Sequence, residues 1–382
     1  MIGVYISKPE AIQKRFISDL EKAKKEIVNY PKLNELFQNF NNYERYSYTT
    51  QRKNIIFNFC TRIGNNEYSN YFKTKLKTID DAITTLKPEE NELRLRMKNT
   101  NQNHSIITEL EFAYFLRNKI KNVTINLWPK LTNGKKSDII LKSAGKEVYF
   151  EVGNLEDSKT QKKINQILTA VAKQVGERSD KIGHIRIIVD TAYFIRSEEG
   201  YIAEIKSEKK LISEINKLKL WELSGKQGHF CRNDLDESIN QIIKHVIIVD
   251  AQRCWTVIEV ESSNSFPGES CGLSHTAWLK RIKVKIESQI NEEKQIELNK
   301  PNVIVIKAPN VNVFELGLAS QTFRNDLKKK IMELFNAIQE KNLSGVIVYG
   351  ECLEESSFFE NPFAAKTSKL EKEVINNLGF KN

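Results

Sequence analysis

Hydrophobic positions between residues 105 and 178 predict a helix, a hairpin and a second helix. Leu110, Ala113 and Leu116 are spaced to lie on one side of a helix over residues 108–116. The runs 135–141 and 147–152 have the composition of two strands, and the turn-like residues 143–146 between them include Gly145. Taken as helical, residues 159–178 carry one apolar stripe, which consists of Ile164, Ile167, Leu168, Val171 and Val175.

Strand alternation predicts which side chains of the hairpin share a face. Ile139 and Leu141 share one face, and Asp138 and Ile140 share the other. Phe150 and Val152 look into a core that Glu151 looks away from. Antiparallel pairing can bring Asp138 and Glu151 side by side. Two like charges at that separation repel each other unless a cation lies between them.

Further apolar runs predict more strands, separated by helices. The β-branched runs 185–190 and 246–250 are expected to extend the same sheet, because they resemble strands that are buried on both faces. Further strands are expected at 255–260 and 301–306, with 344–349 as the last, and helices at 198–220 and around 277–298 and 318–342. The fold class indicated is α/β (α+β): a mixed central sheet flanked by helices on both faces.

Residues 1–100 differ from the rest and predict a mainly helical N-terminal region, separate from a second region over 101–382. Lys87-Pro88 and the polar run 98–103 mark the boundary. Aromatic and basic residues interleave in this region, which suits either contact with nucleic acid or a helical core. They are Tyr43, Tyr46, Tyr48, Arg52, Lys53, Tyr68, Tyr71 and Phe72.

Composition narrows the possible partners. The 382 residues contain 59 Lys and Arg against 49 Asp and Glu, a net charge of +10 that favours polyanions. No apolar run is long enough for a membrane span, and Lys8 and Pro9 interrupt the N-terminal apolar stretch, so we expect a cytoplasmic protein without a membrane partner. Five scattered cysteines argue against disulfides and zinc, and the absence of phosphate-binding glycine motifs argues against a nucleotide cofactor.

The segment from Ser105 to Thr191 resembles the PD-(D/E)XK nuclease superfamily. Ser137-Asp138 stands where that superfamily has Pro-Asp, and Glu151-Val152-Gly153 stands where it has Glu-x-Lys. The resemblance implies a restriction-endonuclease-like core and a metal-dependent endonuclease of a restriction or defence kind that acts on DNA, often as a homodimer. It also implies that Glu109, Asp138 and Glu151 hold one or two Mg²⁺ ions, for which Mn²⁺ can substitute. Glu111 is a rival to Glu109 as the helical ligand.

Gly153 departs from the superfamily pattern, because it stands where the motif lysine offsets charge on the phosphate. Lys163 and Lys136 are candidates for a relocated lysine, and Gln174 for orienting substrate or water, since Lys163 and Gln174 border the apolar stripe of the 159–178 helix. The glycine can equally mean that catalysis was lost, which leaves a DNA-binding or scaffold protein. RNA is an alternative substrate. The basic cluster Lys280, Arg281, Lys283 and Lys285 suits either a phosphate-binding rim or a solvated helix face.

Overall fold

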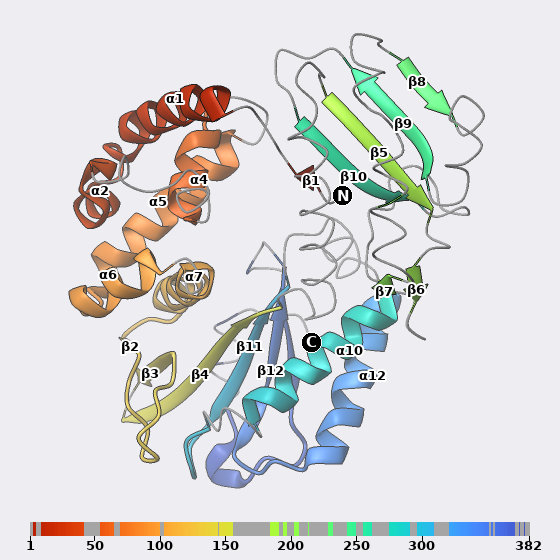
Figure 1. The fold of residues 1–382 in the computed structure, drawn as a ribbon. Coiled ribbons are helices and arrows are strands. Elements are labelled where there is room, and N and C mark those ends of the chain that lie inside the picture. Colours follow the sequence, from red (N-terminus) through yellow and green to blue (C-terminus); the bar gives the residue numbers. More distant parts are fainter. Residues whose placement is uncertain are drawn as a thin grey trace. The chain divides into compact units, whose positions relative to one another are not determined.

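The fold is that of a computed structural model, drawn in Figure 1, which divides into two compact units. One unit contains residues 15–156 and 279–382, and the other contains residues 1–14 and 157–278. The boundary near residue 100 stays a prediction. The structure describes residues 3–4, 9–41, 54–64, 69–99, 103–143, 145–155, 184–190, 194–196, 202–205, 228–231, 243–249, 255–261, 275–290, 296–308, 321–350, 356–370, 213, 353, 374 and 378.

A mixed six-stranded sheet forms the centre of the first unit, with strand order β13-β12-β11-β4-β3-β2. Strands β2, β3 and β4 form an antiparallel meander, β4, β11 and β12 run parallel, and β13 pairs antiparallel with β12. The α+β class with a mixed sheet is therefore confirmed. The strands are β2 (Thr124–Leu127), β3 (Ile139–Ser143), β4 (Lys146–Asn154), β11 (Asn302–Lys307), β12 (Leu343–Tyr349) and β13 (Ser357–Glu360).

The predicted hairpin is confirmed as β3 and β4. Gly145 lies in its turn with φ of +79°, a conformation that glycine adopts without steric cost. Ile139 pairs with Phe150, so both point to the same face, where they are fully buried. Glu151, the next residue of β4, therefore points to the opposite face.

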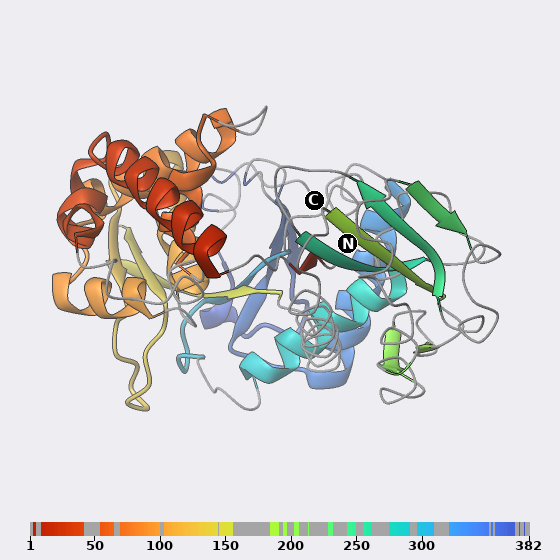
Figure 2. The ribbon, with the colours of Figure 1, turned by 45° about the horizontal axis from the view of Figure 1, so that its top comes forward.

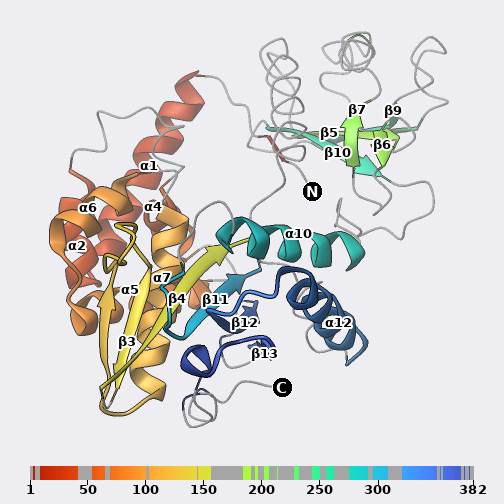
Figure 3. The same cartoon turned by 90° about the horizontal axis from the view of Figure 1, so that it is seen from below.

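Helices cover both faces of this sheet, as predicted. Helix α7 (Asn103–Lys119) packs on the face of Phe150, where the rings of Phe112 and Phe150 lie 5.5 Å apart. Helix α10 (His275–Ser288) lies against Gly153 on the other face, because a Cβ atom added there would touch the Lys285 side chain. Helix α12 (Gln321–Ile338) connects β11 to β12, and a short 3-10 helix, η8 (Lys366–Ser368), follows β13. Figure 3 shows α10 alongside β4 and β11.

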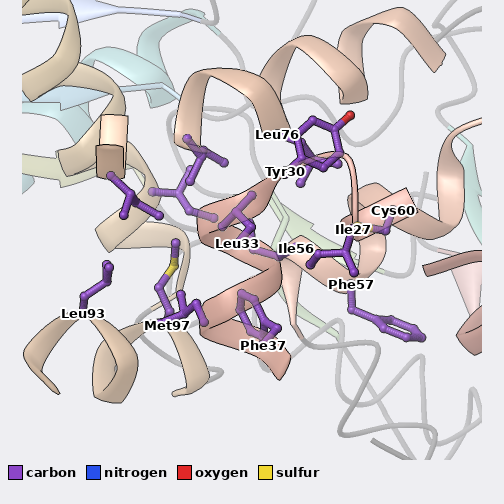
Figure 4. Close-up of a cluster of buried hydrophobic side chains, with 14 of the residues drawn as sticks. Ile27, Tyr30, Leu33, Phe37, Ile56, Phe57, Cys60, Leu76, Leu93 and Met97 are labelled. Carbon is purple, nitrogen blue, oxygen red and sulfur yellow. The ribbon is translucent and has the colours of Figure 1, made fainter. Parts of the chain in front are cut away.

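The N-terminal region is mainly helical, as predicted, and its helices pack against α7 (Figures 1 and 2). Asn54 caps α4 by accepting hydrogen bonds from the backbone N–H groups of Ile56 and Phe57. Figure 4 shows Leu33, Phe57 and other members of its apolar core, to which α7 contributes Leu110. The helices are α1 (Pro9–Ile27), α2 (Pro31–Phe37), η1 (Gln38–Phe40), α4 (Ile55–Arg62), α5 (Ser69–Leu86) and α6 (Glu90–Lys98).

For one aromatic residue of the interleaved set, the helical-core interpretation is supported. Phe72 is buried and its ring lies 5.5 Å from that of Phe59. Residues 43–53 and Tyr68 lie outside the described part of the chain. Among the described residues, no helix combines the length and the apolar character needed to cross a bilayer.

The second unit contains a separate five-stranded sheet with order β1-β10-β5-β9-β8, so the prediction that runs 185–190 and 246–250 extend the first sheet was wrong. An apolar run has a similar composition in either sheet. Which strand it pairs with depends on residues far along the chain, so the run alone does not identify its sheet. The strands are β1 (Gly3–Val4), β5 (His184–Asp190), β8 (Gly228–Cys231), β9 (Ile243–Val249) and β10 (Trp255–Glu261).

Two further predictions of elements were wrong, and a third falls on residues that the structure does not describe. The helix over 198–220 was wrong at Ile202–Ile205, which forms strand β7 and pairs with β6 (Phe194–Arg196). The strand at 344–349 is not the last, because β13 follows it. The helix predicted over 159–178 lies outside the described residues.

Candidate active site

Asp138 and Glu151 are neighbours on one face of the β3–β4 hairpin, as predicted. The backbone N–H of Val152 donates to Asp138 Oδ2 at 2.8 Å, and the two carboxyl groups lie within hydrogen-bonding reach of each other. The buried Ser137 hydroxyl donates to the carbonyl oxygen of Phe150 at 3.2 Å, which holds the strand entry in register. The Asp138 side chain is thus positioned by a backbone contact of the hairpin itself.

Burial raises the pKa of the Asp138 carboxyl to about 7, and the negative charge of Glu109 acts in the same direction. The hydrogen bonds with Glu151 and with the backbone N–H of Val152 oppose this shift, as does the positive charge of Arg96. The pKa is that of a group that binds a proton more readily than an exposed aspartate. A cation bound beside the pair would remove the penalty for ionising both carboxyl groups.

Asp138→Asn should raise the free energy of unfolding near neutral pH when a chelator removes divalent cations. The folded-state pKa is raised, so wild-type stability falls as the pH rises from about 4 to about 7, and the neutral amide avoids this loss. We expect a gain of about 2 kcal/mol at pH 7.5 and almost none at pH 4. Urea unfolding of both proteins across this range measures it, and parallel pH profiles would contradict it.

Glu109 lies on α7 as the third acidic group, and its side chain is only 1% exposed. Its Oε1 accepts hydrogen bonds from Arg96 Nη2 at 2.8 Å and from the Ser105 hydroxyl at 2.9 Å. Its Oε2 accepts from Trp128 Nε1 at 2.7 Å. The structure therefore places the charge of Glu109 near Asp138 but turns its oxygens toward three donors.

Trp128 is a residue of this site that sequence reasoning missed. Its indole donates to Glu109, its backbone N–H donates to the Asp138 carbonyl oxygen at 2.8 Å, and the Arg96 guanidinium carbon lies 4.9 Å from its ring centre. Its φ of +54° is unusual for a bulky residue. Trp128 thus connects the acid of the helix to the start of the hairpin. No motif in the sequence indicated this role.

Glu111, the rival to Glu109, belongs to a different cluster of charges. Lys75 Nζ lies 3.0 Å from its Oε1 and Lys307 Nζ lies 3.2 Å from its Oε2. Lys307 pairs in register with Asn154, at the carboxyl end of β4. Two lysines therefore balance the charge of Glu111, and the position of Glu109 is the one that affects Asp138.

The lysine candidates are placed very differently. Lys136 is 48% exposed at its side chain and pairs with Glu92 at 3.1 Å. Lys163 and Gln174 lie outside the described residues. Lys285 and Gln289 of the α10 segment instead approach Gly153, on the strand face that carries Glu151. Sequence reasoning named Lys285 only within the basic cluster, as a phosphate-binding rim or a solvated helix face, and it missed Gln289. Their spacing of four residues, which places both on one side of a helix, is a signal that could have found them.

The donor chemistry of the Asp138 and Glu151 pair fits a divalent cation, because both are carboxylates on one face and one is reluctant to ionise alone. Glu109 Oε2 accepts one hydrogen bond and keeps a second lone pair for a cation. Across the described residues, no set of three or more acidic, histidine or cysteine side chains has the arrangement of a metal site. The pair is therefore the part of the predicted triad that the geometry brings into direct contact.

Comparisons with known proteins found no protein-family profile, no curated protein and no solved structure that matches this chain.

Proposed function

We propose that this protein is a magnesium-dependent phosphodiesterase that acts on DNA, an endonuclease of a restriction or defence kind. The observation that carries the proposal is the pair Asp138 and Glu151, two adjacent carboxyl groups of which one has a strongly raised pKa. Paired carboxylates of this kind suit a hard divalent cation. When bound, such an ion supplies Lewis acidity to the phosphodiester and lowers the pKa of an attacking water molecule.

The order of elements in the first unit supports a restriction-endonuclease-like core. Helix α7 carries Glu109, and the meander β2-β3-β4 carries Asp138 and Glu151. Within this unit, α10 precedes β11, which lies parallel beside β4. Helix α7, the hairpin of β3 and β4, strand β11 and helix α12 thus follow the order of helix, antiparallel hairpin, strand and helix that the resemblance implies for a nuclease core.

In the proposed reaction, the acids of the site have two tasks. Asp138 and Glu151 would hold the cation, with Asp138 oriented by the Val152 N–H. Glu109, fixed by Arg96, Ser105 and Trp128, adds negative charge beside them and would supply a third oxygen ligand once the cation is bound. The fixed geometry of these donors reduces reorganisation when substrate binds.

DNA is the proposed substrate because the net charge of +10 favours a polyanion. Phosphate contacts do not distinguish the two kinds of backbone well, so RNA is the alternative that a direct comparison decides. A homodimer stays a prediction, as does a cytoplasmic location. A protein that binds DNA without cleaving it is the alternative from another class, which Gly153 favours because the motif lysine is missing there.

The test measures cleavage of plasmid, linear duplex DNA, single-stranded DNA and matched RNA by the full chain with Mg²⁺, with Mn²⁺ or with a chelator. We expect cation-dependent cleavage of DNA, and a loss of at least about 100-fold in Asp138→Asn and Glu151→Gln. Glu147→Gln is the matched control on β4, since Glu147 pairs with Lys142 and Lys300 at the surface. It should cleave like the wild type.

Cation binding gives a readout that does not depend on turnover. Mg²⁺ or Mn²⁺ should raise the thermal midpoint of the wild type, and neither should do so in Asp138→Asn, because the ion stabilises only the state that binds it. A protein that leaves all four substrates intact and gains no stability from either cation overturns the proposal. Stabilisation by the cation together with DNA binding but no cleavage would establish the non-catalytic alternative.

A further inference from the structure

Gly153 leaves a space on β4 that the Lys285 side chain fills. A Cβ atom built at residue 153 would lie 2.7 Å from Lys285 Cε, 3.1 Å from Gln289 Nε2 and 3.5 Å from Lys285 Nζ. Real Cβ atoms do not approach other atoms as closely as the first of these distances. The glycine therefore permits a close approach by the lysine, and no left-handed backbone angle is involved.

The same strand face carries Glu151. Residues two apart in a strand share a face and lie roughly 7 Å apart along it. The Lys285 ammonium, which lies beside Gly153, is therefore on the strand face of the Asp138 and Glu151 pair, two residues beyond Glu151 along β4. Glu151 pairs in register with Ile304 and Gly153 with Ile306, which keeps this stretch of β4 inside the sheet.

Buried residues on either side of Lys285 determine which side of helix α10 faces the strand. Ile282 and Ile286 are 1% and 0% exposed, so this side of the helix packs inward, whereas Val284 is 53% exposed on the other side. Lys285 is partly buried at the border between the two sides. The end of its side chain reaches Gly153, because both Cε and Nζ lie within 4 Å of the Cβ position there.

Gln289, one turn beyond Lys285, gives an independent sign that this face accommodates a ligand. Its side chain is 1% exposed, and its Oε1 is buried without a hydrogen-bond partner among the residues that the structure describes. A buried acceptor without a partner is unfavourable, so a ligand or an ordered water molecule that donates to it would stabilise this face.

We propose that Lys285 is the catalytic lysine of this site, whose ammonium contacts the phosphate of the substrate from the position that Gly153 vacates. The assignment rests on the proposed nuclease function. No bond to Lys285 forms or breaks, because the ammonium only offsets negative charge that develops on the phosphate oxygens. Along the sequence, residues 157–278 of the other unit separate the strand that carries Glu151 from this lysine.

The experiment measures single-turnover cleavage of DNA at saturating protein by Lys285→Met, which keeps an unbranched side chain one atom shorter and removes its charge. We expect a loss of about 100-fold. The thermal shift with Mg²⁺ should remain, because the carboxylates that hold the cation are intact. Lys330→Met is the control, since Lys330 of α12 is likewise 45% exposed at its side chain and pairs with Glu333 at 2.8 Å, and it should cleave at the wild-type rate.

A variant with the lysine moved from α10 to β4 tests whether the loss of cleavage has only a structural cause. In Gly153→Lys combined with Lys285→Ala, the strand supplies the ammonium and the helix leaves the space, so cleavage should recover at least about 10-fold over Lys285→Ala alone. Full activity in Lys285→Met beside an inactive Asp138→Asn overturns this assignment and leaves the proposed function standing. A wild type that cleaves nothing overturns both.

Discussion

Replacing Glu109 with glutamine should lower the free energy of unfolding by about 3 kcal/mol or more, because it leaves Arg96 buried without its counter-ion. The Arg96 and Glu109 side chains are 15% and 1% exposed, and Arg96 Nη2 lies 2.8 Å from Glu109 Oε1. The amide can still accept from Trp128 Nε1, but its NH₂ group then faces Arg96 and Ser105, which are themselves donors. Urea unfolding at pH 7.5 with a chelator measures the loss.

The chain contains a matched control for this substitution. Glu90 pairs with Arg94 of the same helix, α6, also at 2.8 Å, but the two side chains are 69% and 29% exposed. Exposed pairs contribute little, so Glu90→Gln should change the free energy of unfolding by less than about 0.5 kcal/mol. Equal losses in the two variants would show that the burial of Glu109 carries no special energetic weight.

The same variant separates two roles of Glu109 in the proposed reaction. If it contributes an oxygen to the cation, Glu109→Gln weakens the thermal shift caused by Mg²⁺, because one charged ligand is lost. If it acts only through Arg96 and Trp128, the shift persists. Trp128 gives an optical signal for this choice, since its indole donates to Glu109 and any change in that bond alters its fluorescence. We expect a weakened shift.

The sequence predicted the hairpin and its two acids because the information is local. Alternation over a few residues determines the faces of β3 and β4, and Gly145 marks the turn between them. Asp138 and Glu151 needed no other part of the chain to become neighbours. The short strand β2 escaped prediction, because Thr124–Leu127 has too few residues to establish a period.

The parts that failed depend on partners far along the chain. Strand β11, and not β5, lies beside β4, although both contain β-branched apolar runs. Lys285 of α10 approaches Gly153, whereas sequence reasoning named it only within a possible phosphate-binding rim. Lys163, a candidate from the segment after β4, lies outside the described residues and stays a prediction. Gly153 was taken as a missing lysine, and it also marks the place where another lysine approaches. A glycine within a strand indicates close contact without naming the partner.

Gly345→Ala should lower the free energy of unfolding by about 3 kcal/mol, because the added methyl group has nowhere to go. A Cβ atom at residue 345 would clash with the backbone oxygen of Phe359 and lie 2.7 Å from Phe358 Cε2. Both residues belong to β13, which pairs with β12 through Val346 and Phe359. The methyl group can fit only if β13 moves away from β12. Thermal and urea unfolding measure the loss.

Gly153→Ala is the control for that substitution, and the comparison tests what each glycine does. At Gly153 the methyl group meets the flexible end of Lys285, which can turn aside, so stability should change by less than about 1 kcal/mol. Cleavage should nevertheless fall, since the methyl group displaces the ammonium from the face of Glu151. A Gly153→Ala variant as unstable as Gly345→Ala would mean that Lys285 is fixed in place by packing. Unchanged stability with unchanged cleavage would mean that its position beside Gly153 is irrelevant to the reaction.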